Sequence, residues 1–245
     1  MKNSKSFSPH LYFMLPIFVS VCMLFTFMGN SFCKEEPTYT ATDTQKSDKL
    51  TLIIDAGHGG EDGGTVGVNG VLEKDLNLKI AFALRDMALS AGYDTVMSRT
   101  EDVLLYDRNT DYKGRKKALD LLARAKIAEK YENAVFVSIH MNAFPDGKYS
   151  GLQVYYSVND PLSKTVAEDI QSTVRLYLQS TNERKIKPAT SNIYLLDRIT
   201  LPAVLIECGF LSNADECALL SLDSYRQKLA LSIFLSVSKY LGAKS

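Results

Sequence analysis

Two histidines of this 245-residue chain are placed where they could bind one metal ion together. His58 lies in the glycine-rich loop AGHGGEDGG, which follows the apolar run LII, and His140 follows the apolar run VFVSI. Imidazole is the side chain that most commonly binds metals in proteins. One such histidine alone is more often a surface or hydrogen-bonded residue. Two at the ends of apolar runs favour shared ligation instead.

A third ligand would complete such a site, since two histidines, one glutamate and a water molecule form a common open zinc site. Glu73 is the best candidate, because it begins a predicted helix after the glycine-rich loop, and this loop can fold His58 back beside it. A carboxylate in the first turn of a helix also interacts favourably with the helix dipole. From the residues alone, both explanations of Glu73 stay open.

Two further polar residues lie near the ends of predicted strands. Glu207 follows the apolar run PAVLI, where burying an unpartnered carboxylate would cost roughly several kcal/mol. A nearby cation would offset this cost. Asn142, two residues after His140, is a candidate for substrate binding or for support of the metal ligands, although an asparagine in a loop more often bonds to the local backbone.

The segments that carry these residues alternate between strand and helix patterns. Short apolar or β-branched runs predict strands at residues 52–54, 93–98, 134–139, 151–157 and 203–207. Apolar residues at helical spacing predict helices around residues 76–87, 119–130, 166–178 and 225–237. Gly92 is the expected C-terminal cap of the first helix. This alternation predicts an α/β fold with helices on both faces of a sheet and ligands at the strand ends.

The first 33 residues have the features of an export segment. Lys2 and Lys5 precede an apolar run from residue 11 to residue 28. This run is long for a cleaved signal and just long enough to cross a bilayer, so residues 1–33 are predicted to be a signal peptide or an N-terminal membrane anchor. Residues 34–48 are polar and rich in threonine, which is typical of a linker. Residues 49–245 are predicted to form one domain, which is long enough to bury a sizeable core.

The overall charge argues against a nucleic-acid partner. The chain has 28 basic and 28 acidic residues, whereas nucleic-acid binding normally requires a basic excess or a basic face. The glycine-rich loop also lacks the GK[ST] ending of a nucleotide-binding loop. One basic cluster suits either an anionic partner or an ordinary solvated helix start, and it comprises Arg108, Lys113, Arg115, Lys116 and Lys117.

Two cysteines lie in the predicted domain, Cys208 and Cys217. A disulfide between them is chemically allowed in an exported chain. Cysteines in apolar surroundings are more often small buried side chains, so free thiols are the favoured prediction.

Five motifs together resemble those of the zinc-dependent N-acetylmuramoyl-L-alanine amidases. They occur in that family's order and read LIIDAGHGGEDGG, VLEKDLNL, SRTED, FVSIHMNA and AVLIECGFLSN. The resemblance extends from about residue 52 to residue 241. It implies that His58, Glu73 and His140 bind zinc and that Glu207 is the catalytic residue. It also implies an α/β fold consisting of a single domain, with a mostly six-stranded mixed sheet flanked by helices on both faces.

The reaction that the resemblance implies is hydrolysis of the amide bond between N-acetylmuramic acid and L-alanine of the peptidoglycan stem peptide. Zinc would lower the pKa of a water molecule to roughly 7. Glu207 would accept a proton as water attacks the lactyl carbonyl and would return it to the leaving amine. The alternative of a noncatalytic wall-binding regulatory protein is disfavoured, because a degenerate relative should have lost at least one of the four residues.

Two further stretches, TDYKGRKKALDLLARAKIAEK and SGLQVYYS, resemble the germination-specific, spore-cortex branch of the family. That branch implies removal of peptides from muramic acid, so that muramic-δ-lactam can form for germination. It also implies an exported enzyme, in the forespore intermembrane space or on the cortex side. The alternative is a vegetative autolysin used in cell separation. Membrane contact is expected through the N-terminal segment, and control by a partner lipoprotein or by zinc occupancy is a hypothesis.

Overall fold

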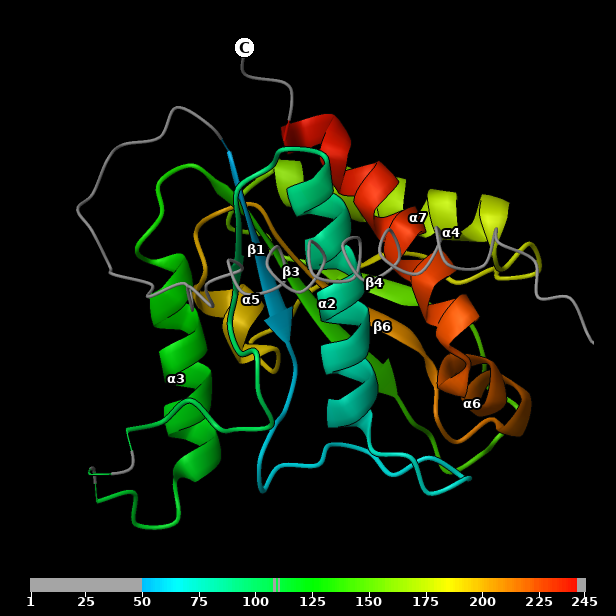
Figure 1. The fold of residues 1–245 in the computed structure, drawn as a ribbon, viewed down its shortest axis with the longest axis horizontal. Coiled ribbons are helices and arrows are strands. Elements are labelled where there is room, and N and C mark those ends of the chain that lie inside the picture. The colour runs from blue at the N-terminus through cyan, green and yellow to red at the C-terminus, as the bar shows by residue number, and fades with distance from the viewer. Residues whose placement is uncertain (1–49, 108, 110, 242–245) are drawn as a thin grey trace, which may run out of the picture. The chain divides into compact units, whose positions relative to one another are not determined.

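The central sheet has six strands in the order β2-β1-β3-β6-β4-β5. Figure 1 labels β1, β3, β4 and β6 of this sheet. The computed structural model describes residues 50–107, 109 and 111–241. The predicted export segment, the predicted linker and Arg108 of the basic cluster lie outside the described residues. The strands are β1 (Thr51–Ala56), β2 (Thr95–Met97), β3 (Ala134–Asn142), β4 (Gln153–Tyr156), β5 (Lys187–Pro188) and β6 (Ala203–Phe210).

Strand direction makes the sheet mixed. The pairs β1–β2, β1–β3, β3–β6 and β4–β5 are parallel, and β4 runs antiparallel to β6. The predicted mixed sheet of six strands is therefore confirmed. β1, β3 and β6 occupy inner positions, and most of their side chains are buried, as expected for parallel strands covered on both sides.

Helices cover both faces of this sheet, as the sequence predicts. The described helices are α2 (Glu73–Ser90), α3 (Lys116–Ala128), α4 (Leu162–Tyr177), α5 (Tyr194–Arg198), α6 (Ala214–Ser221) and α7 (Asp223–Leu241). One apolar core packs α2, α4 and α7 against Val204 and Ile206 of β6. A second core packs α3 and α5 against Ala203 and Leu205, which face the opposite side.

The first helix shows how the sequence pattern produces the packing. Leu76, Ile80, Leu84 and Ala88 of α2 recur on one side of the helix and are buried in the core. The helix is followed by Gly92, whose φ of 82° is in the left-handed region and whose N–H donates to the carbonyl of Leu89 at 3.0 Å. The predicted capping role of Gly92 is confirmed.

Cys208 and Cys217 are free and buried, which confirms the favoured prediction for these cysteines.

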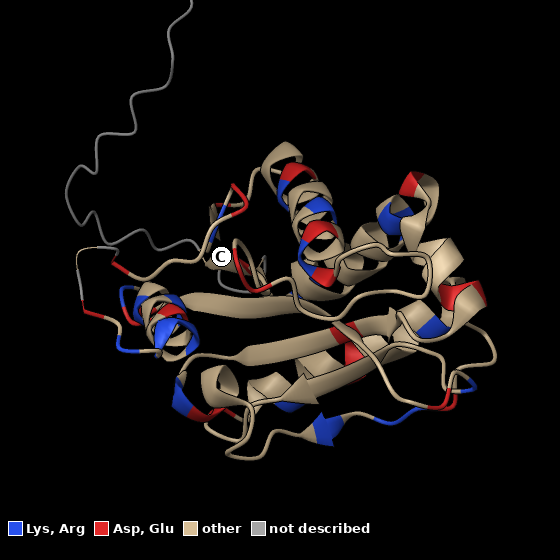
Figure 2. Cartoon of the chain, turned by 90° about the horizontal axis from the view of Figure 1, so that it is seen from below, with Lys and Arg blue, Asp and Glu red and all other residues tan. Residues whose placement is uncertain are grey.

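Within the described part of the chain, no helix is long and apolar enough to cross a membrane. Acidic and basic residues share the same helices and loops in the view of Figure 2, with no separation into one basic face on the side shown.

Candidate metal centre and catalytic site

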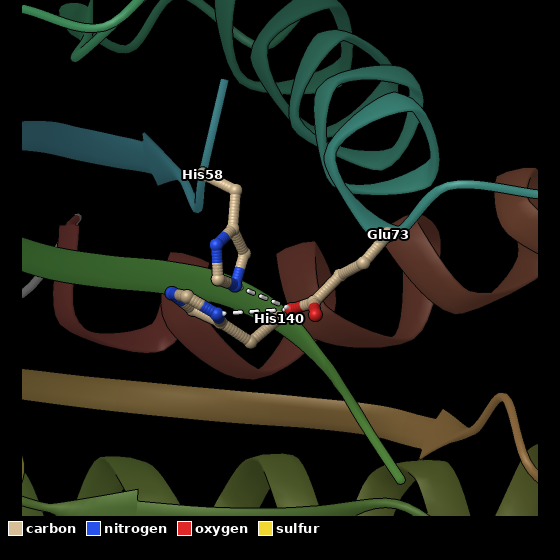
Figure 3. Close-up of side chains that lie close together, drawn as sticks. All are labelled: His58, Glu73 and His140. Atoms are coloured by element: carbon tan, nitrogen blue, oxygen red, sulfur yellow. Dashed lines mark hydrogen bonds and ion pairs between the residues drawn. The ribbon is translucent and has the colours of Figure 1, made fainter. Parts of the chain in front are cut away.

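Three side chains from three different elements converge at the carboxyl ends of the central strands (Figure 3). His58 lies in the loop after β1, Glu73 is the first residue of α2, and His140 lies near the end of β3. Glu73 Oε1 is 3.1 Å from His58 Nε2 and 3.1 Å from His140 Nδ1. One possible ligand atom from each residue lies within 4.8 Å of the others. The structure therefore brings the three predicted metal ligands together.

The loop after β1 places His58 by an unusual backbone turn. His58 has a φ of 61°, a left-handed conformation that costs a residue other than glycine about 1–3 kcal/mol. Close approach also requires glycine at Gly57, where an added Cβ would lie 2.3 Å from the His140 ring. At Gly64 an added Cβ would lie 2.6 Å from Glu73 Oε2. Gly57 and Gly64 thus allow close packing around the proposed ligands.

Two buried arginines hold the same loop through its carbonyl oxygens. Arg124 of α3 donates to the carbonyls of Ala56 and His58 at 2.7 and 2.6 Å. Arg99, which follows β2, donates to the carbonyls of Ala56 and Gly57 at 2.9 and 3.0 Å. Hydrogen bonds from a charged donor to three successive carbonyls fix the path of the loop. These arginines were not among the predicted site residues.

The charge of Arg124 is balanced inside the protein. It pairs with Asp55 at 2.6 Å and with Asp120 at 2.7 Å, and all three side chains are buried. Burial alone would raise the pKa of Asp55, but Arg124 and a hydrogen bond from Ser138 lower it below its ordinary value. The loop is therefore anchored to an ion-pair network that joins β1 to α3, and Ser138 of β3 donates a hydrogen bond to Asp55 in this network.

The carboxylate of Glu73 is held in its charged form. Its Oε1 accepts the backbone N–H of Met141 at 3.0 Å, and its Oε2 accepts that of Thr65 at 2.8 Å. Burial would raise the pKa of Glu73, but hydrogen bonds from His140 and His58 lower it far below its ordinary value. Burial would lower the pKa of His58, yet its contact with Glu73 raises it. Each group thus stabilises the charge of the other.

A second carboxylate lies on the other side of the His58 ring. Asp62 Oδ2 is 2.9 Å from His58 Nδ1, the nitrogen that does not face Glu73. Asp62 is 3.6 Å from Lys117, and its neighbour Glu61 is 2.7 Å from Lys116. This part of the basic cluster therefore joins the start of α3 to the His58 loop.

Glu207 lies beside the three converging side chains without joining them. Its Cα pairs with that of His140 across β3 and β6. Its Oε2 is buried and has no hydrogen-bond partner among the described residues. Burial raises the pKa of Glu207 to about 7, although the nearby His140 opposes this rise. A carboxyl group with such a pKa can both accept and release a proton near neutral pH.

Asn142 ends β3 two residues after His140. Its backbone carbonyl accepts the N–H of Leu211 at 2.8 Å, which links the end of β3 to the end of β6. The predicted contact of its side chain with substrate stays a prediction.

Comparisons with known proteins agree with this geometry. Residues 52–239 match the N-acetylmuramoyl-L-alanine amidase family. The chain is 40% identical over 193 residues to the germination-specific N-acetylmuramoyl-L-alanine amidase of Bacillus subtilis (strain 168), and the match covers 79% of this chain and 80% of that relative.

Solved structures show the same fold. The CwlD amidase from Clostridioides difficile, solved in complex with the GerS lipoprotein, has a TM-score of 0.73 and 39% identity, covering 78% of this chain and 98% of that one. The amidase AmiC2 of Nostoc punctiforme has a TM-score of 0.67 and 28% identity, covering 78% and 97%. Because the family match spans nearly the whole described domain, the chain belongs to the N-acetylmuramoyl-L-alanine amidases and is an enzyme that acts on peptidoglycan.

Proposed function

We propose that His58, Glu73 and His140 hold one zinc ion and that Glu207 is the catalytic acid and base. The observation that carries this proposal is the convergence of two imidazoles and one carboxylate within 4.8 Å at the strand ends. This donor set fits zinc, which commonly binds two histidines and one glutamate in catalytic sites that keep a position open. When bound, zinc supplies a Lewis acid that polarises the scissile carbonyl and makes a water molecule more acidic.

The protein's own residues would control the proton in this reaction. Glu207 Oε2 is unpartnered in the described structure, so it is available to accept a proton from the attacking water. The same carboxyl group would then give the proton to the leaving amine of L-alanine, which breaks the amide bond to muramic acid. In the metal-free protein, burial raises the pKa of Glu207 to about 7.

Two variants separate metal binding from proton transfer. Glu207→Gln should keep one zinc per chain and lose about a hundredfold to ten-thousandfold in kcat, because the base is missing while the ligands are intact. His140→Ala should lose zinc as well as activity. The measurements are zinc content after dialysis and the release of peptides from purified peptidoglycan. Normal turnover by Glu207→Gln, or full zinc content in His140→Ala, would contradict these roles.

We further propose that the substrate is the spore cortex, where peptide removal allows muramic-δ-lactam to form. The support is similarity to a germination-specific amidase at 40% identity and to the CwlD amidase at 39% identity. Muropeptide analysis of spores from a strain carrying Glu207→Gln tests this role. Loss of muramic-δ-lactam is expected. Normal muramic-δ-lactam together with chained cells would instead identify a vegetative autolysin.

An extracytoplasmic location follows from the proposed substrate, and residues 1–33 would provide the export signal or anchor. A partner lipoprotein is also part of the proposal, because the similar CwlD amidase was solved in complex with the GerS lipoprotein. Such a partner would control activity or zinc occupancy. If the purified domain is fully loaded with zinc and active without a partner, that result contradicts control by a lipoprotein.

A further inference from the structure

An irregularity in β6 changes which side chains share a face with Glu207. The strands β3 and β6 pair in register up to His140 and Glu207, and the next pair is Asn142 with Phe210. β6 therefore contains one more residue than β3 over this stretch, which is a β-bulge. Because side chains alternate along a strand, Phe210 would face away from Glu207 without the bulge. The extra residue returns Phe210 to the face of Glu207.

Phe210 supports an arginine on that face. The guanidinium carbon of Arg184 lies 4.4 Å from the centre of the Phe210 ring. Arg184 Nη1 donates to Gln153 Oε1 at 3.3 Å, and Nε donates to the carbonyl of Ser150 at 2.7 Å. Gln153 is the cross-strand partner of Glu207, and directly opposed residues in antiparallel strands share a face. Arg184 is thus linked, through Gln153, to the strand position opposite the proposed catalytic glutamate.

Arg184 forms no salt bridge in the described part of the chain. None of the ion pairs there includes it, and its Nη2 donates no hydrogen bond to a described residue. Glu216 lies close enough for Arg184 to lower its pKa, although burial raises that pKa overall. The Glu216 carboxylate instead accepts the backbone N–H groups of Gly151 and Phe210. The positive charge of Arg184 is therefore left available to a ligand.

Two exposed aromatic rings continue the surface next to Arg184. The Tyr149 ring is centred 6.3 Å from that of Phe210, and the Phe144 ring is centred 4.8 Å from that of Tyr149. Phe144 and Tyr149 are 51% and 37% exposed. We name Phe144, Tyr149, Arg184 and Phe210 the arginine–aromatic ledge. It combines a free cation with apolar surface that a peptide can cover.

We propose that Arg184 binds a free carboxylate of the substrate's stem peptide and that the arginine–aromatic ledge is the peptide side of the binding site. This inference rests on the family's amidase activity. The carboxyl group of muramic acid is consumed in the scissile amide, so the remaining carboxylates of the substrate lie on the peptide. A planar guanidinium stacked on a ring can offer two parallel N–H groups to a carboxylate. Sugar hydroxyls would give Arg184 no comparable charged partner.

The test compares two muramoyl tripeptides that differ only in the acidic residue after L-alanine, which carries either a free α-carboxylate or its amide. The wild-type protein should cleave the carboxylate form with a kcat/KM about tenfold to a hundredfold higher, chiefly through KM. Arg184→Met should lose this preference, because its kcat/KM should fall mainly on the carboxylate form. Arg184→Lys, which keeps the charge but not the planar fork, should retain part of the preference.

Arg198 offers a matched control, because its guanidinium carbon lies 5.2 Å from the centre of the Tyr194 ring, in α5. Arg198→Met should leave the substrate preference unchanged. An unchanged preference in Arg184→Met, or equal cleavage of both tripeptides by the wild-type protein, would overturn the assignment. An equal loss on both tripeptides in Arg184→Met would also overturn it, since that result indicates a structural role. If the wild-type protein cleaves either tripeptide, its amidase activity is established whatever the result for Arg184. The amidase activity and the role of Arg184 can therefore fail separately.

Discussion

At the scale of single residues, the metal centre depends on how closely the backbone approaches the ligand side chains. Gly57 shows this dependence most directly, because its missing side chain leaves the space that the His140 ring occupies. Gly63 lies in the same loop, but an added Cβ there would meet only Leu72 at an ordinary distance of 3.8 Å. Neither glycine has a positive φ that would itself strain an alanine.

These two glycines provide a matched pair of variants. Gly57→Ala should weaken zinc binding about tenfold to a hundredfold, because the new methyl group must displace His140. Gly63→Ala should bind zinc as the wild-type protein does. Competition with a zinc-binding dye measures both affinities. Equal affinities in the two variants would show that the His140 ring can move without loss of the site.

At the scale of elements, a buried ion-pair network joins β1, the strand before the His58 loop, to α3. The network consists of Asp55, Arg124 and Asp120. Arg124 is 1% exposed and Asp55 is fully buried, so removal of one partner leaves the other charge buried with less compensation. The connection between β1 and α3 should therefore depend on the charge of Asp55.

The pH dependence of stability tests this network. The pKa of Asp55 is lower in the folded protein than its ordinary value, so its contribution to stability is present above about pH 4 and is lost as the pH falls through the folded pKa. Asp55→Asn should lower the free energy of unfolding by about 3–5 kcal/mol at neutral pH. The difference from the wild-type protein should shrink below about pH 4.

Urea denaturation of the metal-free proteins at both pH values measures these differences. Glu129→Gln is the control, since Glu129 is an exposed residue just after α3, and it should change stability little at either pH. The same loss of stability in Asp55→Asn at both pH values would contradict a charged Asp55 in the folded state.

The long elements and the convergence of the three proposed ligands could be predicted from the sequence, whereas the supporting contacts could not. The central strands are apolar runs, and the buried side of α2 has a clear helical period. β5 has two residues and α5 has five, which is too short for a period to appear. Arg124 resembles an ordinary polar residue of a helix, because its partners Asp55 and His58 lie 69 and 66 positions away in the chain.

At the scale of the whole molecule, zinc binding and folding should be coupled. The proposed ligands come from the loop after β1, from α2 and from β3, so the unfolded chain cannot present them together. A ligand that binds only the folded state stabilises it by mass action.

Zinc should therefore raise the melting temperature. At a free zinc concentration about a hundred times the dissociation constant, the gain is about 2.7 kcal/mol, which corresponds to about 5–11 °C for a domain of this size. Differential scanning calorimetry with zinc and with a chelator measures the shift. His140→Ala should show no shift at the same zinc concentration. Equal melting temperatures of the wild-type protein in zinc and in chelator would contradict a zinc site in the folded domain.

The strand order also determines when the enzyme can form during synthesis. β6 lies between β3 and β4 in the sheet, although it follows both in the chain. β4 and β5 therefore cannot join β1 and β3 until β6 has been made, and β6 also brings Glu207. Such long-range pairing slows folding. A nascent chain that ends before residue 203 holds the three proposed ligands but lacks the strand that completes both the sheet and the proposed catalytic site, so hydrolysis must await synthesis of β6.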